Sequence, residues 1–201
     1  MTTSIIYRNA SLYELAMLVL YGRHYPSRYR AIADLIPANA SVVDLCCGPA
    51  LLYNRYLREK NVQYTGLDVN RGFIEKLISN GGSGKVWDLR KDDPLPRADY
   101  VMMQASLYHF LPDALPIVER MLKAANHKVI IAEPIKNLAA SNSPLLAMLG
   151  RFFTNPGSGE QPHRFTEASL DELFSVYASR VDQAFLIAGG REKAYVINTT
   201  G

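Results

Sequence analysis

Short apolar runs alternate with amphipathic segments through the middle of the chain. Runs rich in β-branched and other apolar residues predict strands at residues 42–44, 63–67, 85–87, 98–103 and 128–132. Between them, apolar residues at helical spacing predict helices at 51–60, 71–79 and 113–125. Strands that alternate with helices in this way favour a parallel sheet with helices on both faces.

The C-terminal part of the chain predicts a hairpin. Strands are expected over residues 180–188 and 193–199, and the Gly-Gly pair at 189–190 between them is a turn signal. Thr166 is a good N-cap for a helix over 167–177. The fold expected from the whole pattern is a Rossmann-like, doubly wound, seven-stranded sheet, mostly parallel, with a C-terminal antiparallel hairpin strand.

Two further segments flank this pattern within what we expect to be one domain, residues 1–201. Helices predicted at 11–21 and 26–35 place an N-terminal helical lid at 1–37. Its tyrosines and arginines suit either packing on the sheet or covering a polar ligand. Residues 134–165 are irregular apart from a helix predicted at 144–153. We expect this long connection to be a substrate-covering insertion.

Composition narrows the class of protein. The 201 residues are 48% hydrophobic and 20% charged, which is typical of soluble globular proteins. A net charge of +3 is too small to indicate a nucleic-acid partner. The two cysteines, Cys46 and Cys47, are adjacent and imply no disulfide framework, which favours a cytoplasmic protein. We expect no signal peptide and no membrane anchor, because the apolar run at 15–21 is too short to span a bilayer.

Acidic residues stand at the ends of several predicted strands, namely Asp44, Asp68, Asp88 and Glu133. In doubly wound sheets ligands bind beyond the carboxyl ends of the strands. The segment 41–50 combines a strand, a turn at Gly48 and a helix start. Such a turn presents unpaired N–H groups to a ligand that carries a carboxylate, ribose or phosphate.

These segments resemble the class I S-adenosylmethionine-dependent methyltransferases. Residues 43–48, Val-Asp-Leu-Cys-Cys-Gly, look like the first motif of that family, which receives the methionine part of the cofactor. Residues 64–68, Tyr-Thr-Gly-Leu-Asp, resemble the second motif, whose acid binds the two ribose hydroxyls. A carboxylate suits this task because it accepts both hydroxyl hydrogens.

Two more segments extend the resemblance. Residues 87–89 stand where family members place an acid near the adenine amino group, and 104–113 is similar to the segment after the fourth strand in small-molecule methyltransferases. The resemblance implies S-adenosylmethionine as cofactor and no metal. The residues that it implies for cofactor binding are Asp44, Cys46, Cys47, Gly48, Ala50, Asp68, Val69, Asp88, Leu89, Gln104 and Tyr108.

The first motif departs from the family pattern at two positions. Class I methyltransferases usually have glycines where this chain has Cys46 and Ala50. We therefore expect the loop to lie tighter against the cofactor or to be slightly shifted.

Methyl transfer from a sulfonium is an in-line displacement, so holding the acceptor close and aligned supplies most of the catalysis. A base would assist a hydroxyl or a protonated amine, and His109 is the first candidate; the alternative is a histidine that fixes its loop. His163 either faces the acceptor or is an exposed loop residue. Glu133 either contacts the substrate or closes the fifth strand.

We expect the acceptor to be a small molecule that is methylated on oxygen or nitrogen. Enzymes that methylate exocyclic amines carry an Asn/Asp-Pro-Pro-aromatic motif after the fourth strand, and residues 104–107 here are Gln-Ala-Ser-Leu. A monomer or homodimer is expected. The alternatives are a catalytically silent S-adenosylmethionine-binding module that serves a partner and, disfavoured by the absence of G-x-G-x-x-G, an NAD-dependent oxidoreductase.

Overall fold

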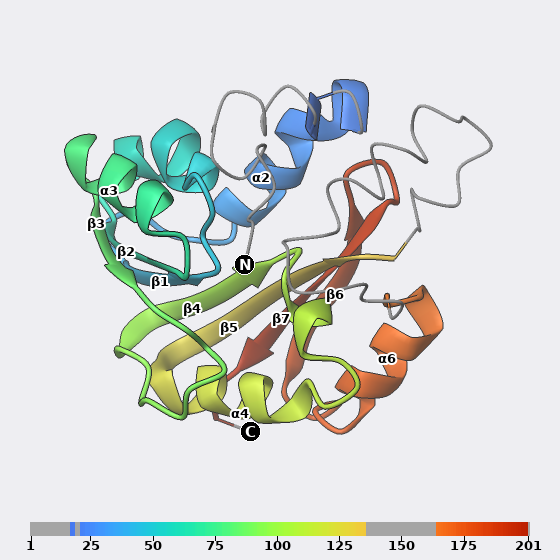
Figure 1. The fold of residues 1–201 in the computed structure, drawn as a ribbon. Coiled ribbons are helices and arrows are strands. Elements are labelled where there is room, and N and C mark those ends of the chain that lie inside the picture. Colours follow the sequence, from blue (N-terminus) through green and yellow to red (C-terminus); the bar gives the residue numbers. More distant parts are fainter. Residues whose placement is uncertain (1–16, 19–20, 136–163, 201) are drawn as a thin grey trace.

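The computed structural model describes residues 17–18, 21–135 and 164–200. Its centre is a seven-stranded sheet with the order β3-β2-β1-β4-β5-β7-β6 (Figure 1). The strands are β1 (Ser41–Leu45), β2 (Gln63–Asp68), β3 (Ser83–Val86), β4 (Ala98–Gln104), β5 (Ala125–Pro134), β6 (Val181–Ile187) and β7 (Glu192–Asn198). Neighbours among β1 to β5 pair in parallel, and β7 is antiparallel to both β5 and β6. The expected mixed sheet with its antiparallel hairpin strand is confirmed.

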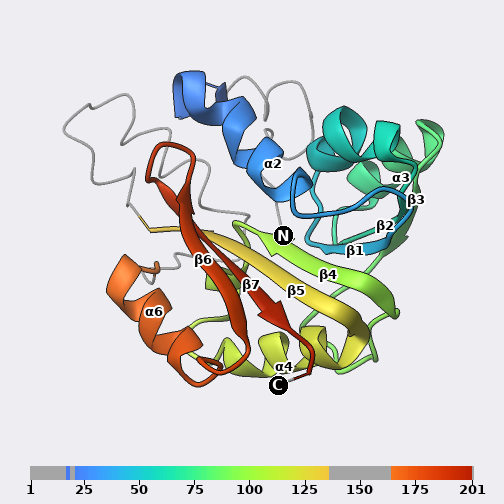
Figure 2. The same cartoon turned by 180° about the vertical axis from the view of Figure 1, so that it is seen from behind.

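Helices cover both faces of this sheet (Figures 1 and 2). One face carries α2 (Tyr25–Ala33), which the short turn η2 (Gly22–His24) precedes, the turns η3 (Tyr53–Leu57) and η4 (Arg58–Lys60), and α3 (Arg71–Ser79). The other face carries α4 (Leu115–Ala124) and α6 (Glu167–Ser175). The short turn η5 (Leu107–Phe110) follows β4.

The core consists of two layers, one on each face of the sheet. Val42 and Met102 pack into the layer that contains α2, whereas their neighbours Val43 and Met103 pack into the layer that contains α4. This alternation follows from the two-residue period of a strand whose faces are both covered. The strands therefore contain nearly continuous apolar runs.

Local signals predicted some elements closely and others less well. The predicted helix at 71–79 is α3, and Asn70 caps it by accepting from Gly72 N and Phe73 N. The predicted helix at 51–60 continues instead as a π-helical turn, η3, and a 3₁₀ turn, η4. The third strand begins at Ser83, two residues before the predicted start, because its pairing with β2 extends back to Ser83.

The predicted helix at 144–153 lies outside the described residues, as do almost all of the predicted helix at 11–21 and almost all of the expected insertion. The second N-terminal helix is present as α2, and it belongs to the core: Tyr25 is 1% exposed and Ile32 is 0% exposed. Within the part of the chain that the structure describes, no helix is both long and apolar enough to cross a membrane.

Candidate functional site

The loop after β1 holds three residues in the left-handed region, with φ 55° at Cys46, 54° at Gly48 and 52° at Ala50. The first and third are the positions where class I methyltransferases usually have glycine. A side chain in this conformation costs about 1–2 kcal/mol, so the surrounding contacts hold the loop in a shape that glycine would adopt freely. A Cβ added at Gly48 would meet no atom within 4 Å, which shows that the loop borders open space there.

Asp68 joins this loop to the end of β2. Its Oδ2 accepts the Gly48 N–H over 2.9 Å, and its Oδ1 accepts the Asn70 N–H over 2.7 Å. Burial raises the pKa of Asp68, and these two backbone hydrogen bonds oppose that shift. Each carboxylate oxygen has two lone-pair sites, so both oxygens keep acceptor capacity for a ligand. The next side chain, Val69, is 60% exposed and offers an apolar surface beside the carboxylate.

Asp44 lies at the end of β1 and is only 5% exposed. Its Oδ2 accepts the Tyr64 hydroxyl over 2.7 Å. Burial raises the pKa of Asp44 to about 7; the nearby Asp68 charge adds to this shift, and the Tyr64 hydrogen bond opposes it. Asp44 and Asp68 are thus two carboxyl groups with raised pKa values, and they lie at the ends of β1 and β2 beside the same loop.

The two cysteines of the loop are free thiols. Burial raises the pKa of Cys46 and of Cys47 above the ordinary thiol value, and the neighbouring carboxylates add to both shifts. Neutral, partly buried thiols are poor nucleophiles. The pair therefore serves as small apolar lining of the loop.

The segment after β3 lies beside Asp68, since the Trp87 N–H donates to the Asp68 carbonyl over 2.9 Å. The carboxylate of Asp88, however, is paired with the Arg90 guanidinium, which donates to both of its oxygens over 2.9 and 3.0 Å. This pairing holds the pKa of Asp88 below its usual value. Leu89 is 4% exposed and packs in the core layer of α4. The Asp88 carboxylate is thus partly exposed and engaged by Arg90, whereas the Leu89 side chain is buried in the core.

Glu133 holds the loop that follows β4. It is fully buried, and its Oε1 accepts the backbone N–H groups of Ser106 and Leu107, each over 2.7 Å. Ala105, at the start of this loop, has φ 54° and donates its N–H to the Ala132 carbonyl. Burial raises the pKa of Glu133 to about 7. Its geometry positions the start of η5.

Tyr108 and His109 stand on η5 with ring centroids 4.0 Å apart. Tyr108 is 8% exposed, and the Arg164 guanidinium carbon lies 3.5 Å from its ring centroid. His109 is partly buried, and its backbone N–H donates to the Ser106 carbonyl. His163 lies outside the described residues and directly precedes Arg164. The structure therefore brings Tyr108, His109 and Arg164 together at the end of β4.

Gln104 belongs to a buried polar cluster that the sequence did not indicate. Its amide donates to the Arg28 carbonyl over 3.3 Å and to Glu192 Oε2 over 3.2 Å. Arg28 and Glu192 form an ion pair with 2.9 Å between Nη2 and Oε1. Glu192 directly precedes the strand predicted at 193–199, and Arg28 is one of several arginines in a predicted helix, so no local signal joins them.

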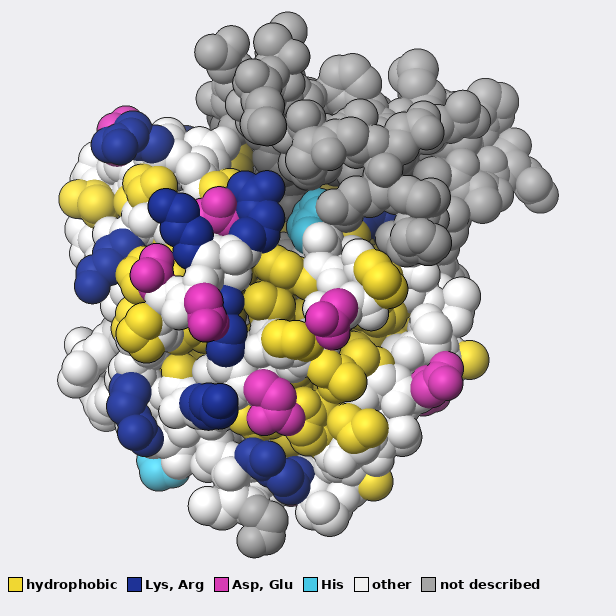
Figure 3. Space-filling view, turned by 60° about the horizontal axis from the view of Figure 1, so that its bottom comes forward, with side chains coloured by type: hydrophobic (Ala, Val, Ile, Leu, Met, Phe, Trp, Pro, Cys, Tyr) yellow, Lys and Arg dark blue, Asp and Glu magenta, His cyan; other side chains and the backbone are white. Residues whose placement is uncertain are grey.

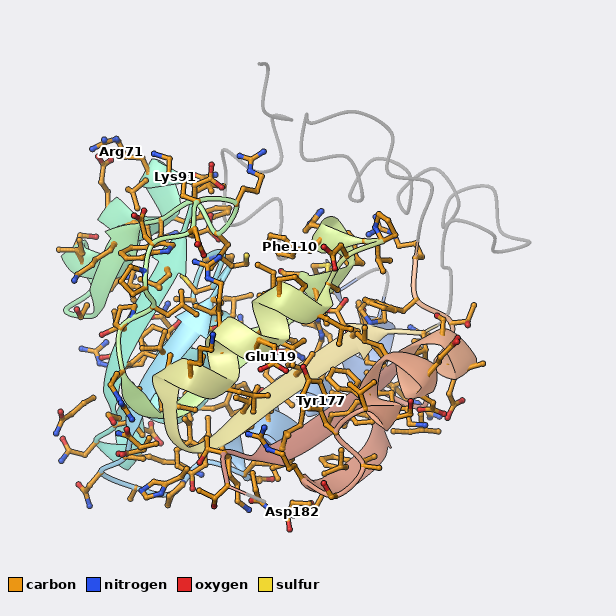
Figure 4. All side chains as sticks on the ribbon, turned by 90° about the horizontal axis from the view of Figure 1, so that it is seen from below. Arg71, Lys91, Phe110, Glu119, Tyr177 and Asp182 are labelled. Atoms are coloured by element: carbon orange, nitrogen blue, oxygen red, sulfur yellow. The ribbon has the colours of Figure 1, made fainter. Side chains whose placement is uncertain are left out.

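These parts lie where the parallel strands end, at one edge of the sheet. Figure 4 shows Arg71, Lys91 and Phe110 toward one edge and Asp182 at the opposite one. Arg71 begins α3, Lys91 follows β3 and Phe110 ends η5, so this is the edge where the parallel strands end. Figure 3 shows the neighbouring face, where Lys and Arg side chains are interspersed with Asp and Glu around a hydrophobic centre. Among the described residues, no group of three or more His, Cys, Asp and Glu is placed to hold a metal ion.

A model of the family described as "MetW: Methionine biosynthesis protein MetW" matches residues 27–139, more than half of the chain. The chain belongs to the MetW family. A search of curated protein sequences found no significant match.

Solved structures place this MetW-family chain in a known fold class. It is similar to a SAM-dependent methyltransferase from Aquifex aeolicus, with 15% identity over 87% of this chain and 90% of that chain, at a TM-score of 0.60. A complex between the Haloferax volcanii Trm112 methyltransferase activator and a putative methyltransferase gives 15% identity, 92% and 94% coverage and a TM-score of 0.65. The chain is also similar to magnesium protoporphyrin IX methyltransferase from Synechocystis PCC 6803 with bound SAH. The identity is 13% over 96% of this chain and 95% of that chain, and the TM-score is 0.61. The fold is therefore that of the class I S-adenosylmethionine-dependent methyltransferases.

Proposed function

We propose that this MetW-family chain is an S-adenosylmethionine-dependent methyltransferase that transfers a methyl group to an oxygen or nitrogen of a small-molecule acceptor. The observation that supports this most directly is the hydrogen bond from Gly48 N–H to Asp68 Oδ2. It joins the loop of the first motif to the acid of the second motif at the edge where ligands bind in doubly wound sheets.

The residues at this edge suit the cofactor. Asp68 retains acceptor capacity for two ribose hydroxyls, and Val69 offers an apolar surface for the adenine ring. Asp44 faces the loop where the amino acid part would lie, and a carboxylate there suits an ammonium group. The loop lining is formed by Cys46, Cys47, Gly48 and Ala50. When bound, S-adenosylmethionine supplies an electrophilic methyl group on its sulfonium.

The two residues implied for contact with the adenine differ in what this proposal requires of them. Asp88 Oδ2 accepts a single hydrogen bond from Arg90, so it keeps a lone-pair site for an adenine amino group. Leu89 has to leave the core layer of α4 before it can touch the ring. Gln104 contributes by anchoring α2 to the sheet through its bonds to Arg28 and Glu192.

The chain's own contribution to the reaction is alignment and proton removal. His109 accepts the proton from an acceptor hydroxyl or ammonium, and Tyr108 forms the wall beside it. Glu133 acts through this pair as a positioning residue, because its carboxylate fixes the backbone that carries them. His163 lies on the acceptor side in this proposal, next to Arg164.

Calorimetry with S-adenosylmethionine and with NADH tests the cofactor part of the proposal. We expect binding of the first and none of the second. A screen with methyl-labelled cofactor and candidate small molecules then tests transfer. Binding of NADH in place of S-adenosylmethionine would move the chain to the oxidoreductases.

A second candidate is a catalytically silent cofactor-binding module that serves a partner. It is favoured by one similar solved structure, which is a complex between a methyltransferase activator and a putative methyltransferase. Cofactor binding without transfer to any acceptor, followed by transfer once a partner is added, would support it.

The free thiols of Cys46 and Cys47 suit a cytoplasmic setting, and we propose a monomer or homodimer there.

A further inference from the structure

Asp44 and Tyr64 meet across two neighbouring parallel strands. The residue opposite Asp44 in the β1–β2 register is Gly66, and Tyr64 precedes it by two positions on the same face of β2. Such diagonal neighbours come within reach only when one side chain is long. Gly66 has no side chain in the way, and the Tyr64 hydroxyl donates to Asp44 Oδ2 over 2.7 Å.

Packing fixes the position of the Tyr64 hydroxyl. The side chain is 4% exposed, and its ring stacks on that of Tyr53 with 4.5 Å between centroids and 16° between planes. A buried ring held in this way has little freedom to follow a moving partner. The hydroxyl therefore holds a fixed position beside the Asp44 carboxylate.

We propose that Tyr64 is a positioning residue for cofactor binding. Its hydroxyl holds Asp44 Oδ2, so that Asp44 Oδ1 is presented to the ammonium group in the amino acid part of the cofactor. This inference rests on the proposed function. By this inference β2 contributes two residues to cofactor binding, Asp68 and the buried Tyr64.

The groups around Asp44 show how this hydrogen bond affects its charge. From β2 it faces Tyr64 and Asp68, and from the loop it faces the thiols of Cys46 and Cys47. Its β4 neighbour is Met102, which does not titrate. Burial and the Asp68 charge raise the pKa of Asp44, and the Tyr64 hydrogen bond lowers it. Removing the hydroxyl thus leaves fewer ionised carboxylates near neutral pH.

The test is calorimetry of S-adenosylmethionine binding to wild type and Tyr64→Phe from pH 6 to pH 9. The ratio of the two dissociation constants at each pH cancels the ionisation of the ligand itself. We expect about a tenfold loss of affinity at pH 7, the size of one hydrogen bond to a charged group, and a severalfold smaller loss at pH 9. Tyr53→Phe is the matched control, because it removes a hydroxyl that is not bonded to Asp44, and its ratio should stay near one.

A loss that is the same at every pH, or no loss, would overturn the inference. If Tyr64→Phe does not fold, 3-fluorotyrosine in place of Tyr64 keeps the ring and makes the hydroxyl a stronger donor. Its affinity should then exceed that of wild type at pH 6, and equal affinity would also overturn the inference. Failure of the wild type to bind S-adenosylmethionine at any pH would instead contradict the proposed function.

Discussion

Arg28 and Glu192 form an ion pair of 2.9 Å at a place where their side chains are only 2% and 0% exposed. The Tyr21 hydroxyl also donates to Glu192, and the Arg28 guanidinium lies over the Tyr21 and Tyr29 rings. The cluster connects α2 to β7 and, through Gln104, to β4. It fixes α2 against the sheet.

Arg28→Met tests the importance of this pair for stability. The change leaves the Glu192 carboxylate buried without its cation, and we expect the free energy of unfolding to fall by about 3–5 kcal/mol in urea. Arg90→Met is the matched control, because it breaks an exposed pair with Asp88 and should change stability by about 1 kcal/mol or less. Equal effects of the two variants would contradict this account.

Asp68→Ala tests the ribose contact. The cofactor hydroxyls lose a charged acceptor, so we expect binding of S-adenosylmethionine to weaken by about 1.5–3 kcal/mol in calorimetry. Asp182→Ala is the control, because Asp182 lies at the opposite edge and pairs with Lys128 (Figure 4). Near-unchanged affinity in Asp68→Ala would remove the cofactor assignment.

Asp44→Asn should separate stability from cofactor binding. Burial raises the pKa of Asp44 to about 7, so its contribution to the stability of the free protein is greatest at low pH and is lost as pH rises through about 7. Asparagine can still accept from Tyr64 and carries no charge. Relative to wild type, the variant should gain roughly 3 kcal/mol of stability between pH 5 and pH 8, at 1.36 kcal/mol per pKa unit. Thermal unfolding at both pH values measures this gain, and a difference independent of pH would disprove it. Cofactor affinity should fall in the same variant.

Gly66→Ala should disturb the packing beneath the loop. The added Cβ would lie 2.7 Å from both Cys47 Sγ and Leu77 Cδ2, and such overpacking costs about 1–3 kcal/mol. Urea unfolding measures the loss. Adding Cys47→Ala should restore part of the stability, since it removes one of the two clashing atoms; no recovery would place the strain elsewhere.

His109→Ala tests the proposed base. Turnover should fall by about 10²-fold or more, the ordinary contribution of a general base, while cofactor affinity stays near that of wild type. Labelled-methyl transfer and calorimetry measure the two quantities. His127→Ala is the control, because His127 is 65% exposed and lies at the start of β5, away from the site. Unchanged turnover in His109→Ala would leave this residue with a structural role only.

Much of the fold was predictable because its signals are local. The bounds of α3 follow from apolar spacing and the Asn70 cap, and Thr166 caps α6 as expected, in a capping box with Ser169. The strand ends that carry Asp44 and Asp68 were predicted for the same reason. The π-helical turn η3 was not, because a five-residue segment is too short to carry a spacing distinct from that of an α-helix.

The sequence by itself determined the order of strands and helices, and with it the edge at which the acidic residues gather, because periods of two and 3.6 residues are encoded within a few positions. Only the tertiary structure decided the partners of those residues. Glu133 holds the loop of His109, and a further acid, Glu192, is buried against Arg28. Both contacts join segments far apart in the chain, and they form because a buried carboxylate must find a donor wherever the fold brings one.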